Sequence, residues 1–416
     1  MTLKKDPRFP QLLASACLAA FLAAMGLGHW AEAQSKRVCI GMTMPFGGLL
    51  ADLAEETKDG ALLAIEEANA HNGVAGYHID TVTLNTFNTT TGTFDPALAA
   101  EGARKLQQDN CVVANIGPLT SGEAKAMSAI LSEGDLATLT PATNPDITDP
   151  KFAEKLRPMG KVVVFRSETT DAYQAPEMAN FFAEKLHVHK VYIIDDAGDF
   201  GIGLASAFEK QAKAKAMVVL GHDQVNPLEA DYATILTKIS AAGAEALYFG
   251  GAREAGVKMM KQSRETMPAM IKGSGDGLYG GLILKSAGFP ASEGWYVTIA
   301  SPYVLEDPVV RPWVQRFVAR WGRQPSSSSI MAYDDALVIL DAVKRVGASG
   351  QSVDRHTIRT AIQNTHLRTV QGPIAYDANG DLQTHVISLF QIQHNPKFPD
   401  DDILHQYKYL GQAPAR

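Results

Sequence analysis

Two segments of the chain carry hydroxyl groups and free backbone N–H groups directly after an apolar run. In residues 116–123, Thr120 and Glu123 have the spacing of a helix capping box, and Ser121 stands beside Thr120. Such a helix start attracts an anion, because its first N–H groups have no partner within the helix. Residues 140–145 form a proline-stiffened loop with further hydroxyls. If the two runs are consecutive strands, these hydroxyls can converge on one carboxylate; helix capping and a plain turn are the alternatives.

An acidic residue flanked by glycines offers the complementary charge. Asp276 lies in residues 275–280, whose glycines formally match the G-x-G-x-x-G pattern of dinucleotide-binding proteins. That fingerprint should open the first unit of a Rossmann fold, whereas this one lies deep in the chain behind a short strand predicted at 269–273. Nucleotide binding is therefore disfavoured. We predict instead that the Asp276 carboxylate faces a cationic group of a ligand.

The sequence carries no pattern typical of catalysis. It lacks the nucleophile motif G-x-S-x-G, the zinc motif H-E-x-x-H and the phosphate-binding G-x-x-x-x-G-K. His187 and His189 have no thiol or carboxylate partner nearby in sequence, so a solvated turn explains them better than a metal site. We therefore expect no enzymatic activity, no metal and no cofactor.

Alternating strands and helices must position these residues. A chain of 416 residues exceeds what one hydrophobic core usually holds, and short β-rich runs alternate with amphipathic helical runs along most of it. This order predicts an α/β fold with parallel sheets in two Rossmann-like lobes. The C-terminal part differs, because the runs at 374–376 and 386–392 flank Asn379-Gly380 and predict a hairpin. The other predicted strands are 38–44, 81–87, 111–116, 137–140, 162–166, 191–195, 217–220 and 246–249, and the main helices are 97–108, 122–131, 173–186, 203–214 and 232–242.

Composition and the N-terminus narrow the location and the partners. The 38 basic and 45 acidic residues give a net charge of −7, which disfavours a nucleic-acid partner. Lys4, Lys5 and Arg8 precede an apolar run at 12–27, and small residues at Ala31 and Ala33 precede a cleavage point. This pattern predicts a signal peptide over residues 1–33 and a mature protein exported to the periplasm. An uncleaved anchor helix is the alternative.

Two of the three cysteines lie near the starts of predicted strands that should be neighbours. Cys39 and Cys111 lie near the starts of the strands 38–44 and 111–116. In an oxidising compartment they can form a disulfide, and two buried free thiols are an equally good alternative.

The order of several segments resembles the periplasmic substrate-binding proteins of branched-chain amino-acid ABC transporters, the Leu/Ile/Val-binding family. The resemblance runs from about Val38 to Ile392, and it implies two lobes joined by three hinge crossings near Arg166, Thr298 and Gly372. Lobe 1 would comprise residues 34–166 and 299–371, and lobe 2 residues 167–298 and 372–416. The segments that carry the resemblance are 40–45, 59–61, 69–73, 116–118, 140–145, 165–167 with Asp171 and Gln174, 199–201, 248–251, 293–298, and 372–373 with Asp377 and 380–382.

The resemblance also implies a ligand site between the lobes. In amino-acid binders of this family, a serine, an alanine carbonyl and a threonine hold the ligand head group, and they correspond to Ser121, Ala142 and Thr143. Asp276 resembles the carboxylate that pairs with the ligand ammonium. Where aromatic residues often line the family pocket, this chain has Leu53, Phe200 and Ala252, and Arg253 beside Ala252 would suit a larger or more acidic ligand.

The function implied is that of an extracytoplasmic solute-binding protein. It would capture a small amino acid or related compound and deliver it, as a monomer, to the membrane permease of an ABC transporter. An organic-acid binder, including one for aromatic acids, and a ligand sensor for a membrane receptor are the alternatives with the same fold. A transcriptional repressor would need a DNA-binding module where the signal peptide lies.

Overall fold

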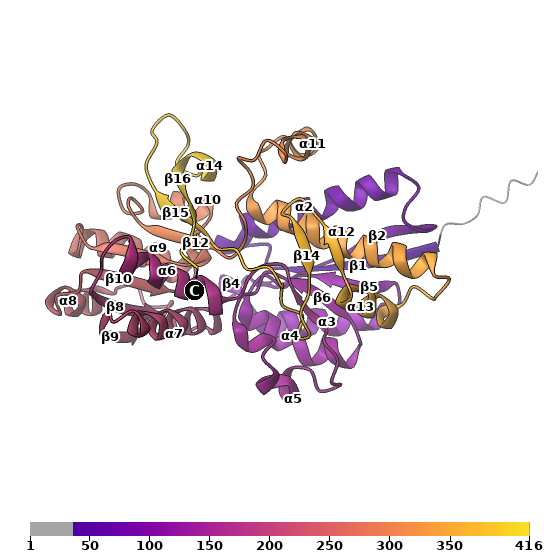
Figure 1. The fold of residues 1–416 in the computed structure, drawn as a ribbon, viewed down its shortest axis with the longest axis horizontal. Coiled ribbons are helices and arrows are strands. Elements are labelled where there is room, and N and C mark those ends of the chain that lie inside the picture. The colour runs from indigo at the N-terminus through magenta and orange to yellow at the C-terminus, as the bar shows by residue number, and fades with distance from the viewer. Residues whose placement is uncertain (1–35, 416) are drawn as a thin grey trace, which may run out of the picture. The chain divides into compact units, whose positions relative to one another are not determined.

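Two mainly parallel sheets organise the chain in the computed structural model, which describes residues 36–415 (Figure 1). The predicted signal peptide at 1–33 lies outside the described residues. The sheet of the first lobe has the order β2-β1-β5-β6-β7, and that of the second lobe β16-β15-β12-β11-β10-β8-β9. The first comprises β1 (Lys36–Met44), β2 (Tyr77–Asn85), β5 (Val112–Ile116), β6 (Ala137–Thr140) and β7 (Val164–Arg166); the second comprises β8 (Lys190–Asp195), β9 (Val218–Gln224), β10 (Ala246–Gly250), β11 (Ile271–Ser274), β12 (Tyr296–Ile299), β15 (Ser388–Ile392) and β16 (Tyr407–Gln412).

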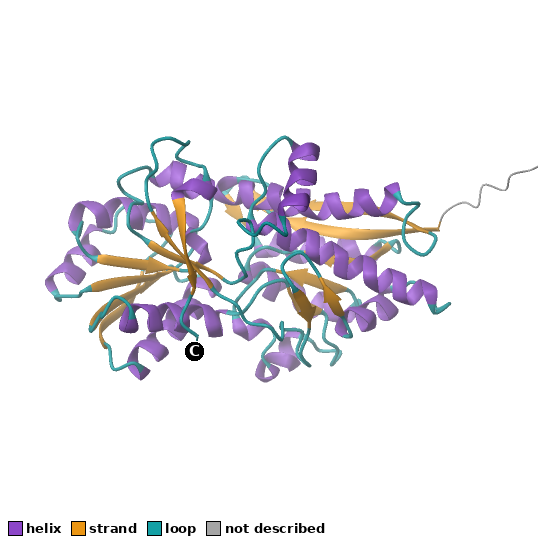
Figure 2. Cartoon of the chain, turned by 45° about the horizontal axis from the view of Figure 1, so that its top comes forward, coloured by secondary structure: helices purple, strands orange, loops and turns teal. Residues whose placement is uncertain are grey.

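The predicted parallel α/β fold is confirmed. The neighbours of β5, β6 and β10 run parallel to them, and only β15 and β16 add antiparallel pairs to the second sheet. Along β10, Leu247 and Phe249 belong to one core of the second lobe, and Ala246 and Tyr248 to the other. Successive side chains of a strand point to opposite faces, so this strand is apolar throughout because helices cover both faces of its sheet (Figure 2).

Helices follow the strands as the periodicity predicts. Asp95 caps one of them through a 2.7 Å bond from the backbone N–H of Ala97, and Pro96 occupies its first position. The first lobe contains α2 (Ala51–Ala70), α3 (Pro96–Gln108), α4 (Ser121–Glu133), α5 (Ala153–Leu156), α11 (Arg311–Trp321), α12 (Ser327–Ala348) and α13 (Arg355–Gln363); the second contains α6 (Asp171–Glu184), α7 (Asp199–Ala214), α8 (Ala233–Ala241), α9 (Arg253–Thr266), α10 (Gly281–Ala287) and α14 (Ile403–Gln406).

A glycine sets the spacing of two long helices in the first lobe. A Cβ atom on Gly60 of α2 would lie 2.0 Å from the carbonyl oxygen of Ser329 in α12. The two helices therefore approach backbone to backbone at this point, a distance that only glycine permits. Their buried faces complete the core with Ile40, Ile116 and Leu139 of the sheet.

The hairpin predicted around Asn379-Gly380 is wrong. A short strand β14 (Pro373–Ala375) pairs antiparallel with β13 (His366–Arg368), whereas β15 pairs with β12 and β16. A bridge between Tyr376 and Leu382 does close a turn. The two apolar runs face different cores, because Ile374 is buried in the first lobe and Leu389 in the second.

The third crossing between the lobes follows from this packing. Tyr376 is buried in the core of the first lobe and Leu382 packs against that core, while Ile387 belongs to the second. The chain therefore passes from lobe to lobe between Leu382 and Ile387, later than the predicted position near Gly372. The other two crossings stay predictions, near Arg166 and near Thr298.

A disulfide joins two neighbouring strands of the first sheet. Cys39 of β1 and Cys111, just before β5, are bonded with their Cα atoms 5.0 Å apart. The strands run parallel with Cys39 opposite Val112, and the backbone N–H of Cys39 donates to the carbonyl of Cys111 at 2.6 Å.

Within residues 36–415, none of the helices combines the length and apolarity needed to cross a bilayer.

The disulfide predicts the thiol content of protein that begins at Gln34, which contains only Cys39 and Cys111. Unreduced, denatured protein should show no free thiol and, after reduction, two thiols. Reduction should also lower the free energy of unfolding by ~4 kcal/mol, the chain-entropy value for a loop of this length. Thiol titration and denaturant melts measure both quantities, with Cys39→Ser as the control that leaves one free thiol. Two titratable thiols without reduction would rule out the bridge.

Candidate functional site

The start of α4 brings together the two hydroxyl-bearing segments. The Thr120 side chain caps the helix, accepting a bond from the backbone N–H of Glu123 at 3.4 Å and donating to the Glu123 carboxylate at 2.8 Å. Ser121 is the first residue of the helix and is buried. Its hydroxyl accepts a hydrogen bond from the backbone N–H of Asn144 at 3.3 Å, so the loop after β6 lies against the start of α4.

A buried arginine shapes the loop that follows β6. The fully buried guanidinium of Arg166 donates to the carbonyls of Ala142 and Asn144, the latter at 2.6 Å, and to Asp381 at 3.0 Å. The Ala142 carbonyl, which the prediction assigns to the ligand, therefore already accepts one hydrogen bond and retains one lone pair. Thr143 is buried next to it, and its carbonyl accepts a bond from the backbone N–H of Asp171 at 2.9 Å.

Asp276 begins a short 3-10 helix, η4 (Asp276–Leu278), directly after β11 in the second lobe. Burial raises the pKa of its carboxyl to about 6, while a hydrogen bond from Gln174 and the charge of Arg253 oppose that increase. The carboxylate is therefore mostly ionised at neutral pH, and the residue is partly buried. Such a group is stabilised by a cation brought to it.

The three predicted pocket-lining residues lie at the starts of helices. Leu53 is in the first turn of α2 and packs partly against the first core. Phe200 is in the first turn of α7, and a Cβ atom on Gly277 would lie 2.9 Å from its ring, so it lies beside the loop of Asp276. Ala252 precedes α9, and its backbone N–H donates to Asp196 at 2.7 Å.

Contacts between the lobes lie next to these residues. The guanidinium of Arg253 in the second lobe donates to the carbonyl of Leu49 at 2.7 Å and to the carboxylate of Asp52 at 3.1 Å, both in the first lobe. Lys125 of α4 forms an ion pair with Asp199 of α7 at 2.7 Å. Arg253 was expected to suit an acidic ligand; in the structure its charge is instead paired with Asp52.

Sequence reasoning overlooked a polar group on the first crossing and on the helix after it. Glu168 follows β7, and burial together with repulsion from Asp276, Asp335 and Asp171 raises the pKa of its carboxyl well above the usual range. Gln174, fully buried on α6, bonds Asp276. The signal in the sequence was the position of these polar residues, with Glu168 shortly after a buried strand and Gln174 within a buried helix.

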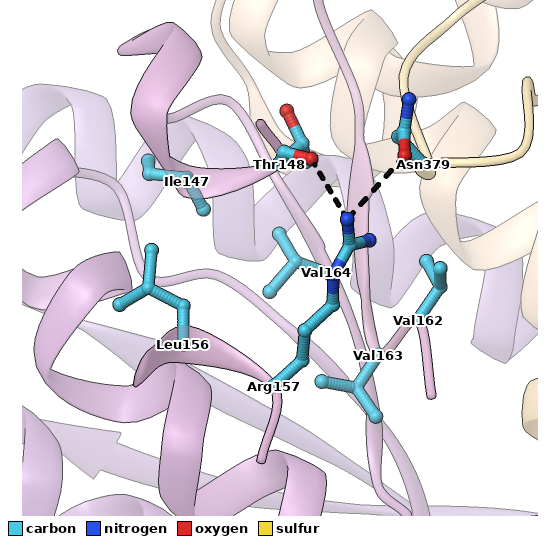
Figure 3. Close-up of a pocket in the computed structure, with 8 residues that line it drawn as sticks. All are labelled: Ile147, Thr148, Leu156, Arg157, Val162, Val163, Val164 and Asn379. Atoms are coloured by element: carbon cyan, nitrogen blue, oxygen red, sulfur yellow. Dashed lines mark hydrogen bonds between the residues drawn. The ribbon is translucent and has the colours of Figure 1, made fainter. Parts of the chain in front are cut away.

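A small pocket in the first lobe lies apart from the predicted ligand residues. Arg157 points across it and donates to the Thr148 carbonyl at 3.3 Å and to the Asn379 side chain at 3.4 Å (Figure 3). The other residues that line the pocket are aliphatic: Ile147, Leu156, Val162, Val163 and Val164. Within residues 36–415, no group of three or more histidine, cysteine or acidic side chains could hold a metal ion.

A family model described as periplasmic binding protein matches residues 37–397. The chain belongs to the periplasmic binding protein family. Among curated relatives, it is 29% identical to Leu/Ile/Val-binding protein homolog 3 of Brucella melitensis over 376 residues, which cover 89% of this chain and 95% of the relative. It is 24% identical to a leucine-, isoleucine-, valine-, threonine- and alanine-binding protein of Pseudomonas aeruginosa over 379 residues, or 90% and 95% of the two chains.

Solved structures support the same fold for this periplasmic binding protein. A leucine-binding protein from Thermotoga maritima aligns with a TM-score of 0.77 at 23% identity, covering 90% of this chain and 98% of the other. A solute-binding protein from Rhodopseudomonas palustris in complex with p-hydroxybenzoic acid aligns with a TM-score of 0.74 at 18% identity, covering 92% and 98%. The family is one of solute-binding proteins that are generally not enzymes and act outside the cytoplasm.

The buried cap of α4 predicts a pH-dependent stability. Burial raises the pKa of Glu123 from 4.5 to about 7, so its contribution to stability is complete below pH 4.5 and is lost as the pH rises through 7. Glu123→Gln keeps the acceptor for Thr120 and removes the charge. As the pH rises from 4 to 8, the free energy of unfolding of the variant should increase relative to that of wild type by up to about 3 kcal/mol.

Denaturant melts across this pH range measure the difference. Glu133→Gln, at an exposed position near the end of the same helix, is the matched control and should show no such trend. A difference between Glu123→Gln and wild type that does not change with pH would contradict the assignment.

Proposed function

We propose that this periplasmic binding protein captures an amino acid between its two lobes and delivers it to the permease of an ABC transporter. The proposal is supported by the presence of one charge-binding element in each lobe. The start of α4, with Ser121 and the neighbouring Thr143, is suited to a carboxylate, and Asp276 of the other lobe is suited to an ammonium group. An α-amino acid carries both groups on one carbon atom.

The names of the relatives agree with this proposal, since several are described as binding leucine, isoleucine and valine. Thr120, Ser121, Ala142 and Thr143 would hold the head group from the first lobe. Leu53, Phe200 and Ala252 would line the side-chain pocket. The protein would act as a monomer in the periplasm after removal of residues 1–33.

We assign the lobes by the cores in which their residues pack. Lobe 1 comprises residues 37–166 and 304–382, and lobe 2 comprises residues 167–303 and 383–415. The last boundary follows the burial of Tyr376 in the first core and of Ile387 in the second. These are the two bodies that would close on the ligand.

An organic-acid binder is the second candidate. The Rhodopseudomonas palustris structure of the same fold holds p-hydroxybenzoic acid, a carboxylate without an ammonium group. Such a ligand would use the start of α4 and leave Asp276 without a cation, at a cost for a buried carboxylate. The two candidates therefore differ in what Asp276 does.

The substitution Asp276→Asn distinguishes the amino-acid binder from the organic-acid binder. The change keeps the shape and removes the charge, so it should weaken L-leucine about ten-fold or more, because a charge-assisted bond contributes roughly 1.5–3 kcal/mol. It should leave 4-methylpentanoic acid, the deaminated analogue, unchanged or more tightly bound. Titration calorimetry of both compounds measures this, with Asp231→Asn at an exposed position of the second lobe as control. Wild-type preference for the deaminated acid would favour the organic-acid binder.

Closure predicts a second result. A ligand that touches both lobes favours the closed arrangement by its differential contacts, so the radius of gyration should fall when the ligand found by calorimetry is added. Arg253→Gln loses the contacts with Leu49 and Asp52 and should give a weaker apparent affinity and a larger radius at half saturation. Small-angle X-ray scattering measures the radius. An identical radius with and without saturating ligand would contradict closure.

A further inference from the structure

A tyrosine on the C-terminal strand contacts the loop that begins with Asp276. The Tyr407 hydroxyl donates to the carbonyl of Leu278 at 2.6 Å and accepts a hydrogen bond from the backbone N–H of Gly280 at 3.2 Å. The Gly280 carbonyl lies 3.5 Å from the same hydroxyl and is the weaker acceptor, because the hydroxyl has only one proton to donate. The hydroxyl therefore bonds the backbone on both sides of Tyr279.

These bonds fix the end of the turn that Asp276 begins. The helix η4 comprises Asp276–Leu278, and the backbone N–H of Tyr279 donates to the carbonyl of Asp276 at 2.9 Å. This i to i+3 bond closes a single turn of 3-10 helix. A shift of the backbone at Leu278 would therefore also move Asp276, two residues before it.

The backbone groups that Tyr407 bonds are removed from water. Leu278 and Gly280 are both buried. Without the hydroxyl, the carbonyl of Leu278 and the N–H of Gly280 would each lose a partner that water does not replace unless the loop moves. The position of the loop therefore depends on this one side chain.

The core of the second lobe sets the position of the Tyr407 ring. Tyr407 is 2% exposed, and it lies opposite Ile392 in the antiparallel ladder of β15 and β16. The centroid of its ring is 4.6 Å from that of Tyr279 and 6.5 Å from that of Phe390. A ring packed in this way has little freedom, so its hydroxyl is a fixed point for the loop.

The contacts of the loop with Asp52 depend on the other lobe. Asp52 of the first lobe accepts a hydrogen bond from the backbone N–H of Leu282 at 3.2 Å. Arg253 donates to the carbonyl of Tyr279 at the longer distance of 3.4 Å, and the same guanidinium also bonds Asp52. Tyr407, in contrast, belongs to the same core as Tyr279. Its bonds to the loop therefore persist when the lobes separate.

We propose that Tyr407 is a positioning residue of the ligand site, whose hydroxyl holds the loop of Asp276 in the geometry that receives the ligand ammonium before the lobes close. This inference rests on the proposed function and adds a residue of the C-terminal strand to the same site. A group already held in its binding geometry loses less conformational freedom when the ligand arrives. Tyr407 thus raises the affinity without touching the ligand.

A double-mutant cycle with L-leucine as the probe tests the proposal. Tyr407→Phe keeps the ring and removes the hydroxyl, and it should weaken L-leucine about five-fold or more, the fold-change that corresponds to about one hydrogen bond. In the Asp276→Asn background, the same change should alter the affinity by less than about two-fold, because the loop no longer carries the charge that Tyr407 positions. Titration calorimetry of wild type, the two single variants and the double variant measures this.

Hydrogen–deuterium exchange measures the loop itself without a ligand. The backbone amides of residues 277–282 should exchange at least about five-fold faster in Tyr407→Phe than in wild type, because opening of the loop becomes easier. Tyr409→Phe is the matched control, since Tyr409 lies on the same strand and packs in the same aromatic cluster. It should change neither the exchange of the loop nor the affinity. Thermal melts establish that each variant is folded.

The outcomes separate this inference from the proposed function. Equal weakening by Tyr407→Phe in both backgrounds would overturn the inference alone, because the hydroxyl would then support the fold in general. Unchanged exchange of residues 277–282 would also overturn it, as would a Tyr407→Phe variant that does not fold. If wild type does not bind L-leucine, or if Asp276→Asn binds it as tightly as wild type does, the proposed function is overturned and this inference with it.

Discussion

A guanidinium group buried away from water must have its N–H donors satisfied by the protein, and Arg166 meets this requirement with partners from three parts of the chain. It bonds the loop after β6, the hydroxyl of Thr148 at 3.1 Å and the carboxylate of Asp381. Its own backbone N–H donates to the carbonyl of Gly380 at 2.9 Å. One side chain therefore fixes the loop of Thr143, the segment at Thr148 and the turn at 377–381. Because that turn is held to the first lobe, the third crossing comes after it.

Charge pairing divides the region between the lobes into two zones. At one side, Arg253 and Asp52 neutralise each other across the lobes, as do Lys125 and Asp199. Around the first crossing, burial and the nearby carboxyl groups of Asp276, Asp335 and Asp171 raise the pKa of Glu168 well above its usual range. The ion pairs of the first zone contribute to lobe contact without a ligand, whereas the crowded carboxyl groups of the second zone favour their protonated forms.

Patterns local in sequence were sufficient for most of the fold. The alternating order of strands and helices predicted β5, β6 and β10, and the spacing of Thr120 and Glu123 predicted the start of α4 within one residue. The Asn379-Gly380 signal predicted a turn correctly but not its strand partners. Those partners depend on which core each apolar run meets, and that choice is made by the buried Arg166–Asp381 pair more than 200 residues apart in sequence. The pairing of Arg253 with Asp52 and the crowding of acids around Glu168 are likewise contacts between distant segments.

The close approach at Gly60 links the core of one lobe to the hinge. Helix α12, whose distance from α2 this glycine sets, carries Asp335, and Asp335 holds the Ser167 hydroxyl next to Glu168. A change of one methyl group between the helices would thus be transmitted to the crossing through a single hydrogen bond. Selection can in this way adjust how readily the lobes close, and how strongly a solute is retained, without altering any residue that touches the solute. Residues remote from the site can therefore change how strongly a solute is retained, while the residues that touch the solute determine which solute is bound.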